Sequence, residues 1–186
     1  TETVTSTLNP LISTGDPVID GRTGLTFPRI DVLTALGSVN DNFASNTLLL
    51  GITNQTITTA NIIASSQFAS KEPFEPNHAG NSGGKSVWFE WTSPAVGIVS
   101  INTHGSNFDT LLAVYSGSSL STLSVVASND DDGSPDNNSS LSFVATAGAT
   151  YKIAIDGFNG AFGQIAMNLE FVADTSGPGT TVPAAP

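Results

Sequence analysis

Near the C-terminus the chain reads Tyr151-Lys152-Ile153-Ala154-Ile155-Asp156 and then Ile165-Ala166-Met167-Asn168-Leu169-Glu170-Phe171. In both stretches large apolar residues alternate with small or polar ones, which is the period of a β-strand with one buried face. Less regular alternation predicts further strands over residues 57–64, 87–92, 97–103, 110–115, 123–128 and 141–146. Glycine, asparagine, aspartate and serine fill the breaks between them, as in the turns of antiparallel sheets.

These strands, about eight in all, predict the fold class. They are short and evenly spaced, and no long amphipathic helical pattern lies between residues 86 and 173. The pattern therefore favours an all-β sandwich or barrel over a parallel α/β sheet. Two short helices are predicted before this region, over residues 30–36 and 43–50, because a glycine follows the first and asparagine and aspartate precede the second.

The two ends of the chain differ from the middle. Residues 1–37 hold three of the ten prolines and both arginines without clean strand alternation, so we expect a mostly irregular N-terminal extension. Residues 175–186 consist mainly of glycine, proline, threonine and alanine, a composition typical of a linker-like tail. The expected β-domain lies between them, over residues 38–174.

Composition excludes several functions. The chain has 186 residues, of which 39% are hydrophobic, enough for one core. With 16 acidic and 5 basic residues, its net charge of −11 argues against nucleic acid as a partner, and its apolar runs are too short for insertion into a membrane. The lack of cysteine excludes disulfides, thiolate metal sites and thiol nucleophiles. Few charges and many small polar residues are typical of secreted β-proteins, so we expect an extracellular protein.

Several motifs carry a resemblance to a known family. They are Asn40-Asp41-Asn42-Phe43-Ala44, Lys71-Glu72-Pro73-Phe74-Glu75-Pro76-Asn77-His78-Ala79-Gly80-Asn81, Gly84-Lys85-Ser86-Val87-Trp88-Phe89, residues 105–115, Ala127-Ser128-Asn129-Asp130-Asp131 and Ala154-Ile155-Asp156-Gly157. Through them residues 38–173 resemble bacterial pre-peptidase C-terminal domains. The resemblance implies an antiparallel, jelly-roll-like β-sandwich, similar to the collagen-binding domains of clostridial collagenases and attached after the catalytic domain of a secreted enzyme.

A second resemblance concerns the N-terminal extension. Residues 11–17 and 23–32, followed by Ala35-Leu36, resemble the closing segment of a subtilisin-like peptidase domain. The chain would then be the C-terminal part of a secreted subtilase. Such an enzyme carries its nucleophile in a Gly-Thr-Ser motif, which does not occur here, and His104-Gly105-Ser106 fits a turn better than an active site. We therefore expect no catalytic residue and no enzymatic activity.

Oxygen-bearing side chains suggest calcium, a cation that takes six to eight oxygen ligands. The resemblance implies a site at the entrance to the domain, which is the segment Asn40-Asp41-Asn42. Ser38 and Val39 stand before it, where the relatives have glutamates. The loop before residue 87 could approach this entrance. A third cluster is Asp130-Asp131-Asp132-Gly133-Ser134-Pro135-Asp136. Its adjacent aspartates repel one another, so either a bound cation or a solvated turn explains them. The candidate ligands are Asn40, Asp41, Glu72, Glu75, Asn77, Asp130 and Asp132.

Trp88 is the candidate ligand-binding residue. On a strand over residues 87–92, Val87, Phe89 and Trp91 face one way, whereas Trp88 and Glu90 face the other. An exposed Trp88 could stack on a sugar or contact a protein, and packing in the core or beneath a loop is the alternative.

Two functions follow from these expectations. The first is a non-catalytic, calcium-stabilised accessory module of a subtilisin-like peptidase, which binds a polymeric protein or glycan or a cell-surface component. The second is a self-assembling subunit of an extracellular fibre or surface layer. In the second case residues 1–37 and 175–186 pack on neighbouring copies, since the many aliphatic residues of the extension need cover.

Overall fold

The structure is a computed structural model that describes residues 17–19, 26–28, 40–50 and 57–175. The chain divides into two compact units, residues 1–38 and 39–186. In the first, β1 (Pro17–Ile19) pairs antiparallel with β2 (Thr26–Pro28). The helix predicted over residues 30–36 lies outside the described residues, as do residues 176–186 of the tail.

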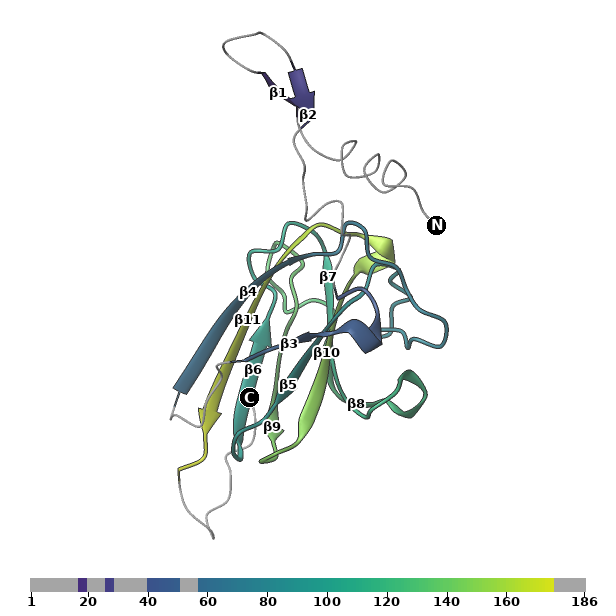
Figure 1. Cartoon of the computed structure of the whole chain (residues 1–186). Helices are drawn as coiled ribbons and strands as arrows, with labels where there is room; N and C mark the ends of the chain where they lie inside the picture. The colour runs from purple at the N-terminus through teal and green to yellow at the C-terminus, as the bar shows by residue number, and fades with distance from the viewer. Residues whose placement is uncertain (1–16, 20–25, 29–39, 51–56, 176–186) are drawn as a thin grey trace, which may run out of the picture. The chain divides into compact units, whose positions relative to one another are not determined.

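The described residues of the second unit form two sheets (Figure 1). The five-stranded sheet has, in spatial order, β3 (Thr47–Leu48), β5 (Val87–Thr92), β10 (Thr150–Gly157), β7 (Thr110–Ser116) and β8 (Ser124–Asn129). The four-stranded sheet has β4 (Ile57–Ser65), β11 (Gln164–Ala173), β6 (Gly97–Asn102) and β9 (Ser140–Ala145). Neighbouring strands are antiparallel, except that β3 runs parallel to β5.

The eight longer strands have the order of a jelly roll. In the four-stranded sheet the first, eighth, third and sixth of them lie side by side, and in the other sheet the second, seventh, fourth and fifth. The all-β, jelly-roll-like sandwich is therefore confirmed. The ends of all eight strands lie within two residues of the predicted ones.

The main core lies between the sheets. From the five-stranded sheet it receives the alternating residues of β5 and β10, with Phe89 opposite Ile153 in the register. From the four-stranded sheet it receives Ile101 of β6 and Phe171 of β11 among others. The period-two pattern of the sequence correctly identifies these inward positions, because each of these strands presents one face to the opposite sheet.

The outer face of the five-stranded sheet is also partly buried. A second cluster there consists of Phe43, Trp88, Ala113, Tyr115 and Ala154. The long loop over residues 66–86 lies against this cluster, since the ring of His78 contacts both Trp88 and Tyr115. The sheet is therefore covered twice, by the other sheet on one face and by a loop on the other.

The helix predicted over residues 43–50 is wrong. A single 3-10 turn, η1 (Phe43–Ser45), is followed at once by β3. The side chain of Asn46 donates to the carbonyl of Phe43 at 2.7 Å, and Leu49 donates its backbone N–H to Glu90 on β5 at 2.8 Å. Pairing with the sheet edge thus replaces helical hydrogen bonds.

Two further 3-10 turns connect the strands, η2 (Leu120–Thr122) between β7 and β8 and η3 (Phe158–Gly160) between β10 and β11. Within the described ranges, no helix has the length and apolar character needed to cross a membrane.

Candidate functional site

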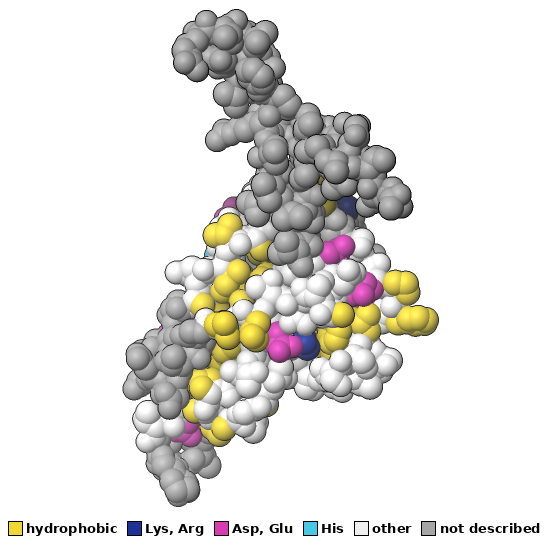
Figure 2. Space-filling view, in the orientation of Figure 1, with side chains coloured by type: hydrophobic (Ala, Val, Ile, Leu, Met, Phe, Trp, Pro, Cys, Tyr) yellow, Lys and Arg dark blue, Asp and Glu magenta, His cyan; other side chains and the backbone are white. Residues whose placement is uncertain are grey.

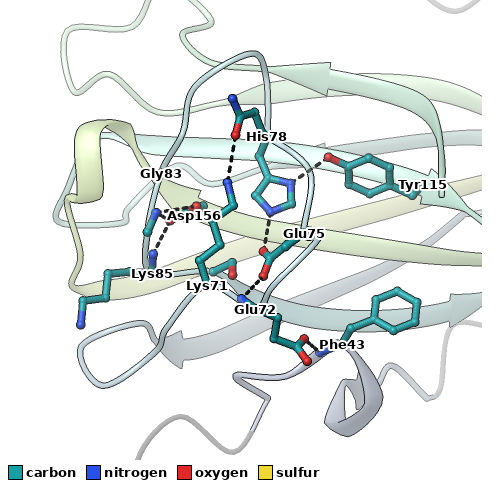
Figure 3. A network of polar contacts seen from close by, with 12 residues as sticks. Phe43, Lys71, Glu72, Glu75, His78, Gly83, Lys85, Tyr115 and Asp156 are labelled. Atoms are coloured by element: carbon teal, nitrogen blue, oxygen red, sulfur yellow. Dashed lines mark hydrogen bonds and ion pairs between the residues drawn. The ribbon is translucent and has the colours of Figure 1, made fainter. Parts of the chain in front are cut away.

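A buried polar network fixes the 66–86 loop to the outer face of the sheet (Figure 3). Nε2 of His78 lies 2.8 Å from Oε1 of Glu75, and Nδ1 lies 2.8 Å from the hydroxyl of Tyr115 on β7. Oε2 of Glu75 accepts the backbone N–H of Glu72 at 2.8 Å. Burial, and then the charge of Glu75, raise the pKa of Tyr115 above its ordinary value, so its hydroxyl keeps its proton and can donate to the ring.

The same loop reaches the entrance segment, as the sequence suggested. Oδ1 of Asp41 accepts the backbone N–H of Ser70 at 2.6 Å, and Oε2 of Glu72 accepts that of Phe43 at 2.5 Å. Asn40 is buried and bonds only to the strand below, because its Nδ2 donates to the carbonyl of Trp88 at 3.1 Å.

This arrangement does not fit a calcium ion at the entrance. A calcium site presents oxygens to the metal, whereas here the oxygens of Asp41, Glu72 and Glu75 accept N–H groups of the protein. The ammonium of Lys71 donates to Oδ1 of Asn77 at 3.2 Å, so a positive charge already lies among the candidate ligands. Asp41, Glu72, Glu75 and Asn77 instead form hydrogen bonds that hold the loop in place, while Asn40 bonds to β5.

Trp88 is not available to a ligand, and the structure shows the alternative, cover beneath a loop. Its side chain is 0% exposed. The ring of Phe43 packs on it edge-on at 5.2 Å between centroids, and the ring of His78 lies at 5.4 Å. The strand period places Trp88 correctly on the outer face, but the loop that covers this face belongs to a distant part of the sequence.

Carboxylates do gather at the third predicted cluster, but Asp109 and Asp131 accompany Asp130 in place of Asp132. Asp109, Asp130 and Asp131, which we call the aspartate cluster, each place an oxygen within 4.8 Å of the others. Asp132 does not join them. Its Oδ2 lies 2.5 Å from Nε2 of His104, and this bond, followed by one from Ser134, lowers the pKa of Asp132 to about 2.

The aspartate cluster is electrostatically unfavourable as it stands. The pKa of Asp109 and the pKa of Asp130 are both raised, first by burial and then by the negative charge of Asp131. Asn137 offsets part of this at Asp109, since its Nδ2 donates to Oδ2 at 3.4 Å. Sequence reasoning missed Asp109 because it precedes β7, far from the aspartate run, although it belongs to one of the motifs quoted above.

A groove of about 700 Å³ is open to solvent on the outer face of the five-stranded sheet. Phe43 and the loop residues 72–74 form one wall, and residues 118–121, between β7 and β8, form the other. Glu90 and Lys152, which are paired across β5 and β10, line it between the walls. The ammonium of Lys152 also lies 4.9 Å from the centroid of the Phe43 ring.

Phe74 is the most prominent side chain of this groove. It is 91% exposed, and its backbone adopts a positive φ of 72°. A bulky residue in this region of φ is a strained exception, and such exceptions cluster at functional sites. Figure 2 shows one face of the molecule, on which an acidic and a basic side chain lie next to a patch of hydrophobic ones.

The rings of the two histidines bond to carboxylates and to a tyrosine hydroxyl. The His104 ring bonds to Asp132, and the His78 ring bonds to Glu75 and Tyr115.

Comparison with known proteins gives distant likenesses of fold. No protein-family model matches the chain, and no curated protein matches it by sequence. Among solved structures, the pre-peptidase C-terminal domain of a collagenase from Bacillus anthracis is 11% identical, with 67% of this chain and 91% of that chain covered and a TM-score of 0.40.

Two further solved structures are similar to the chain. A periplasmic inhibitor of g-type lysozyme from Aeromonas hydrophila is 11% identical, with 68% and 95% covered and a TM-score of 0.37. The CBM36-1 domain of a multidomain xylanase, from the hindgut metagenome of Trinervitermes trinervoides, is 13% identical, with 65% and 100% covered and a TM-score of 0.30. Likenesses of this size say nothing about function.

Proposed function

We propose that this chain is a non-catalytic β-sandwich module whose groove binds a segment of a polymeric protein or glycan. The observation that carries the proposal is the groove around Phe74. It combines an exposed aromatic ring in a strained backbone conformation with hydroxyl groups and a charged pair. Its volume of about 700 Å³ is typical of sites that hold small ligands or short polymer segments.

The chemistry of the walls indicates which polymers the groove accepts. Aromatic rings stack on the apolar faces of sugars and on apolar side chains, and serine hydroxyls donate and accept hydrogen bonds. Glu72 and Glu90 add negative charge in a chain whose net charge is −11. Neutral glycans and polypeptides with basic groups therefore suit the groove, whereas anionic polymers are repelled.

The wider setting belongs to the same proposal. The resemblance of residues 11–17, 23–32 and 35–36 to the end of a subtilase supports a module that follows a secreted serine peptidase and holds its substrate nearby. In this proposal calcium stabilises the domain by binding at the aspartate cluster rather than at the entrance. Self-assembly through residues 1–37 and 175–186 stays a prediction, because these segments lie almost wholly outside the described residues.

A retention assay tests the groove. The full chain is mixed with insoluble collagen, chitin, cellulose or xylan, and the protein left in solution is measured. Phe74→Ala is expected to weaken retention about tenfold or more, as removal of a central aromatic anchor does at other interfaces. Phe162→Ala is the matched control, since Phe162 is 51% exposed but does not line the groove. Equal retention of both variants, or no retention of the wild type on any polymer, contradicts the proposal.

A further inference from the structure

The aspartate cluster forms because of the pairing of two strands. Asp109 comes directly before β7, whereas Asp130 and Asp131 come directly after β8. Because β7 and β8 are antiparallel neighbours, with Leu112 opposite Asn129, the beginning of one strand lies beside the end of the other. The cluster is thus held by the rigid edge of a sheet rather than by a free loop.

An independent observation comes from Asn138. Its side chain is 1% exposed, yet its Oδ1 is buried without a hydrogen-bond partner. Two hydrogen bonds connect the segment around Asn138 to the region of the cluster. Its own carbonyl accepts the N–H of Asp132 at 3.1 Å, and the preceding Asn137 bonds to Asp109. A buried carboxamide oxygen that lacks a donor therefore belongs to a residue whose backbone is bonded to Asp132 and whose neighbour is bonded to Asp109.

Two of the carboxylates also have an oxygen without a hydrogen-bond donor. Oδ1 of Asp109 and Oδ1 of Asp130 are also buried without partners. Together with Asn138 this makes three unsatisfied acceptors in one region, whereas buried oxygens in proteins are nearly always paired. All three can only accept, so the group they lack is a donor or a cation.

The basic side chains of the described residues do not supply that group. Lys71 bonds to Asn77, Lys85 lies over the ring of Phe162, and Lys152 pairs with Glu90. His104 is held by Asp132, outside the cluster. Three neighbouring carboxylates thus have no partner of opposite charge among these residues.

We propose that the aspartate cluster and Oδ1 of Asn138 form a binding site for one calcium ion. The site shares no residue with the groove, so calcium binding and polymer binding can be tested independently. It differs from the site expected at the entrance, and it contains Asp109 and Asp131 in place of Asp132.

The donor set favours calcium over other metals. It consists of oxygens alone, carboxylate and amide, which hard cations prefer, and it lacks the nitrogen and sulfur ligands of zinc. Oxygens on opposite sides of a calcium ion lie about 5 Å apart, because each bond is about 2.4 Å long. The three ligand oxygens of the cluster all lie within 4.8 Å of one another, so they are close enough together to contact a single ion. Magnesium requires shorter bonds and a stricter octahedron, so we expect it to bind less tightly.

Thermal unfolding of the full chain tests the site. The protein is treated with a chelator, dialysed and melted without metal, with CaCl₂ and with MgCl₂. A site with an affinity near 10⁻⁴ M, saturated by about 5 mM CaCl₂, is expected to raise Tm by roughly 5–10 °C. Calorimetric titration with CaCl₂ is expected to show one ion per chain, and MgCl₂ a smaller shift in Tm.

Variants locate the site. Asp109→Asn and Asp130→Asn are expected to weaken calcium binding at least about tenfold, because each removes a charged ligand. Without calcium both variants are expected to melt at or above the wild-type temperature, since they also remove repulsion. If Asp109 and Asp130 only supported the fold, both substitutions would instead lower the melting temperature without calcium. Asp136→Asn, in the same loop but outside the cluster, and Asp41→Asn, at the entrance, are expected to respond to calcium as the wild type does.

Three results would overturn the proposal. The first is a wild-type chain whose melting and titration do not respond to CaCl₂. The second is a full calcium response in Asp109→Asn or Asp130→Asn. The third is loss of the response in Asp41→Asn, which would place the ion at the entrance instead.

Discussion

At the scale of single residues, Asp156 shows how one carboxylate organises a loop. It lies at the end of β10 and is fully buried. Its oxygens accept the backbone N–H groups of Gly84 at 2.9 Å, Lys85 at 2.7 Å and Gly157 at 2.8 Å. Gly83 beside it has a φ of 56°, and a Cβ there would lie 1.7 Å from Oδ2 of Asp156. Glycine at position 83 is therefore required by the carboxylate.

Asp156→Ala leaves these three N–H groups buried without an acceptor. We expect the free energy of unfolding to fall by about 2–4 kcal/mol, since hydrogen bonds to a charged group are strong and unpaired buried donors are penalised. Urea unfolding monitored by circular dichroism measures the change. Asp136→Ala, at an exposed position, serves as the control and is expected to lie within about 0.5 kcal/mol of the wild type. Equal stability of the two variants would contradict this account of Asp156.

At the scale of elements, the 66–86 loop acts as a fixed cover over the five-stranded sheet. Glu75 and His78 in the loop and Tyr115 on β7 form its buried attachment, and Asp41 and Asp156 hold its two ends. The cover turns the outer face of β5 and β10 into a second core. Fluorescence of the tryptophans reports on it, because Trp88 and Trp91 are both buried.

His78→Ala removes the attachment and the ring that packs on Trp88. We expect the emission maximum of the native protein to shift to longer wavelength and acrylamide to quench it more strongly, because water reaches Trp88 when the loop opens. His104→Ala is the matched control, as His104 does not contact Trp88. An unchanged spectrum in His78→Ala would mean that the loop stays closed without this network.

Tyr115 predicts how stability depends on alkaline pH. Its pKa is raised in the folded protein above the ordinary value of 10.0, so the folded state holds the phenolic proton more tightly than the unfolded state. The resulting stability is fully present below pH 10.0 and is lost as the pH rises beyond it. Tyr115→Phe is expected to be less stable at neutral pH but to lose less stability on the alkaline side. Parallel alkaline slopes for the two proteins in urea unfolding would contradict this.

At the scale of the whole molecule, the net charge of −11 opposes association between copies. A module that binds a polymer through its groove has no need of self-assembly. We therefore expect light scattering at neutral pH to give the mass of one chain over a wide range of concentration. Polymers in the same measurement would favour the fibre or surface-layer alternative, and deletion of residues 1–37 would then show whether that extension forms the contact.

The sequence predicts the positions of the strands well, but it predicts poorly which distant segments contact one another. Alternation along β10 and β11 identifies the faces of these strands because each meets the opposite sheet directly. Contacts between distant segments cover Trp88 and bring Asp109 into the aspartate cluster. The alternation of residues along a strand gives no information about such contacts. The wrong helix over residues 43–50 has a similar cause, since pairing of β3 with β5 decides its conformation.

The order of strands also has a consequence for synthesis on the ribosome. β4, the first long strand of the domain, has β11, the last one, as its neighbour, and β5 lies beside β10. A nascent chain therefore cannot close either sheet until nearly the whole domain has emerged from the exit tunnel, and such non-local pairing makes folding slow. Chains truncated within β11 should remain protease-sensitive, while the complete domain acquires resistance in a single late step.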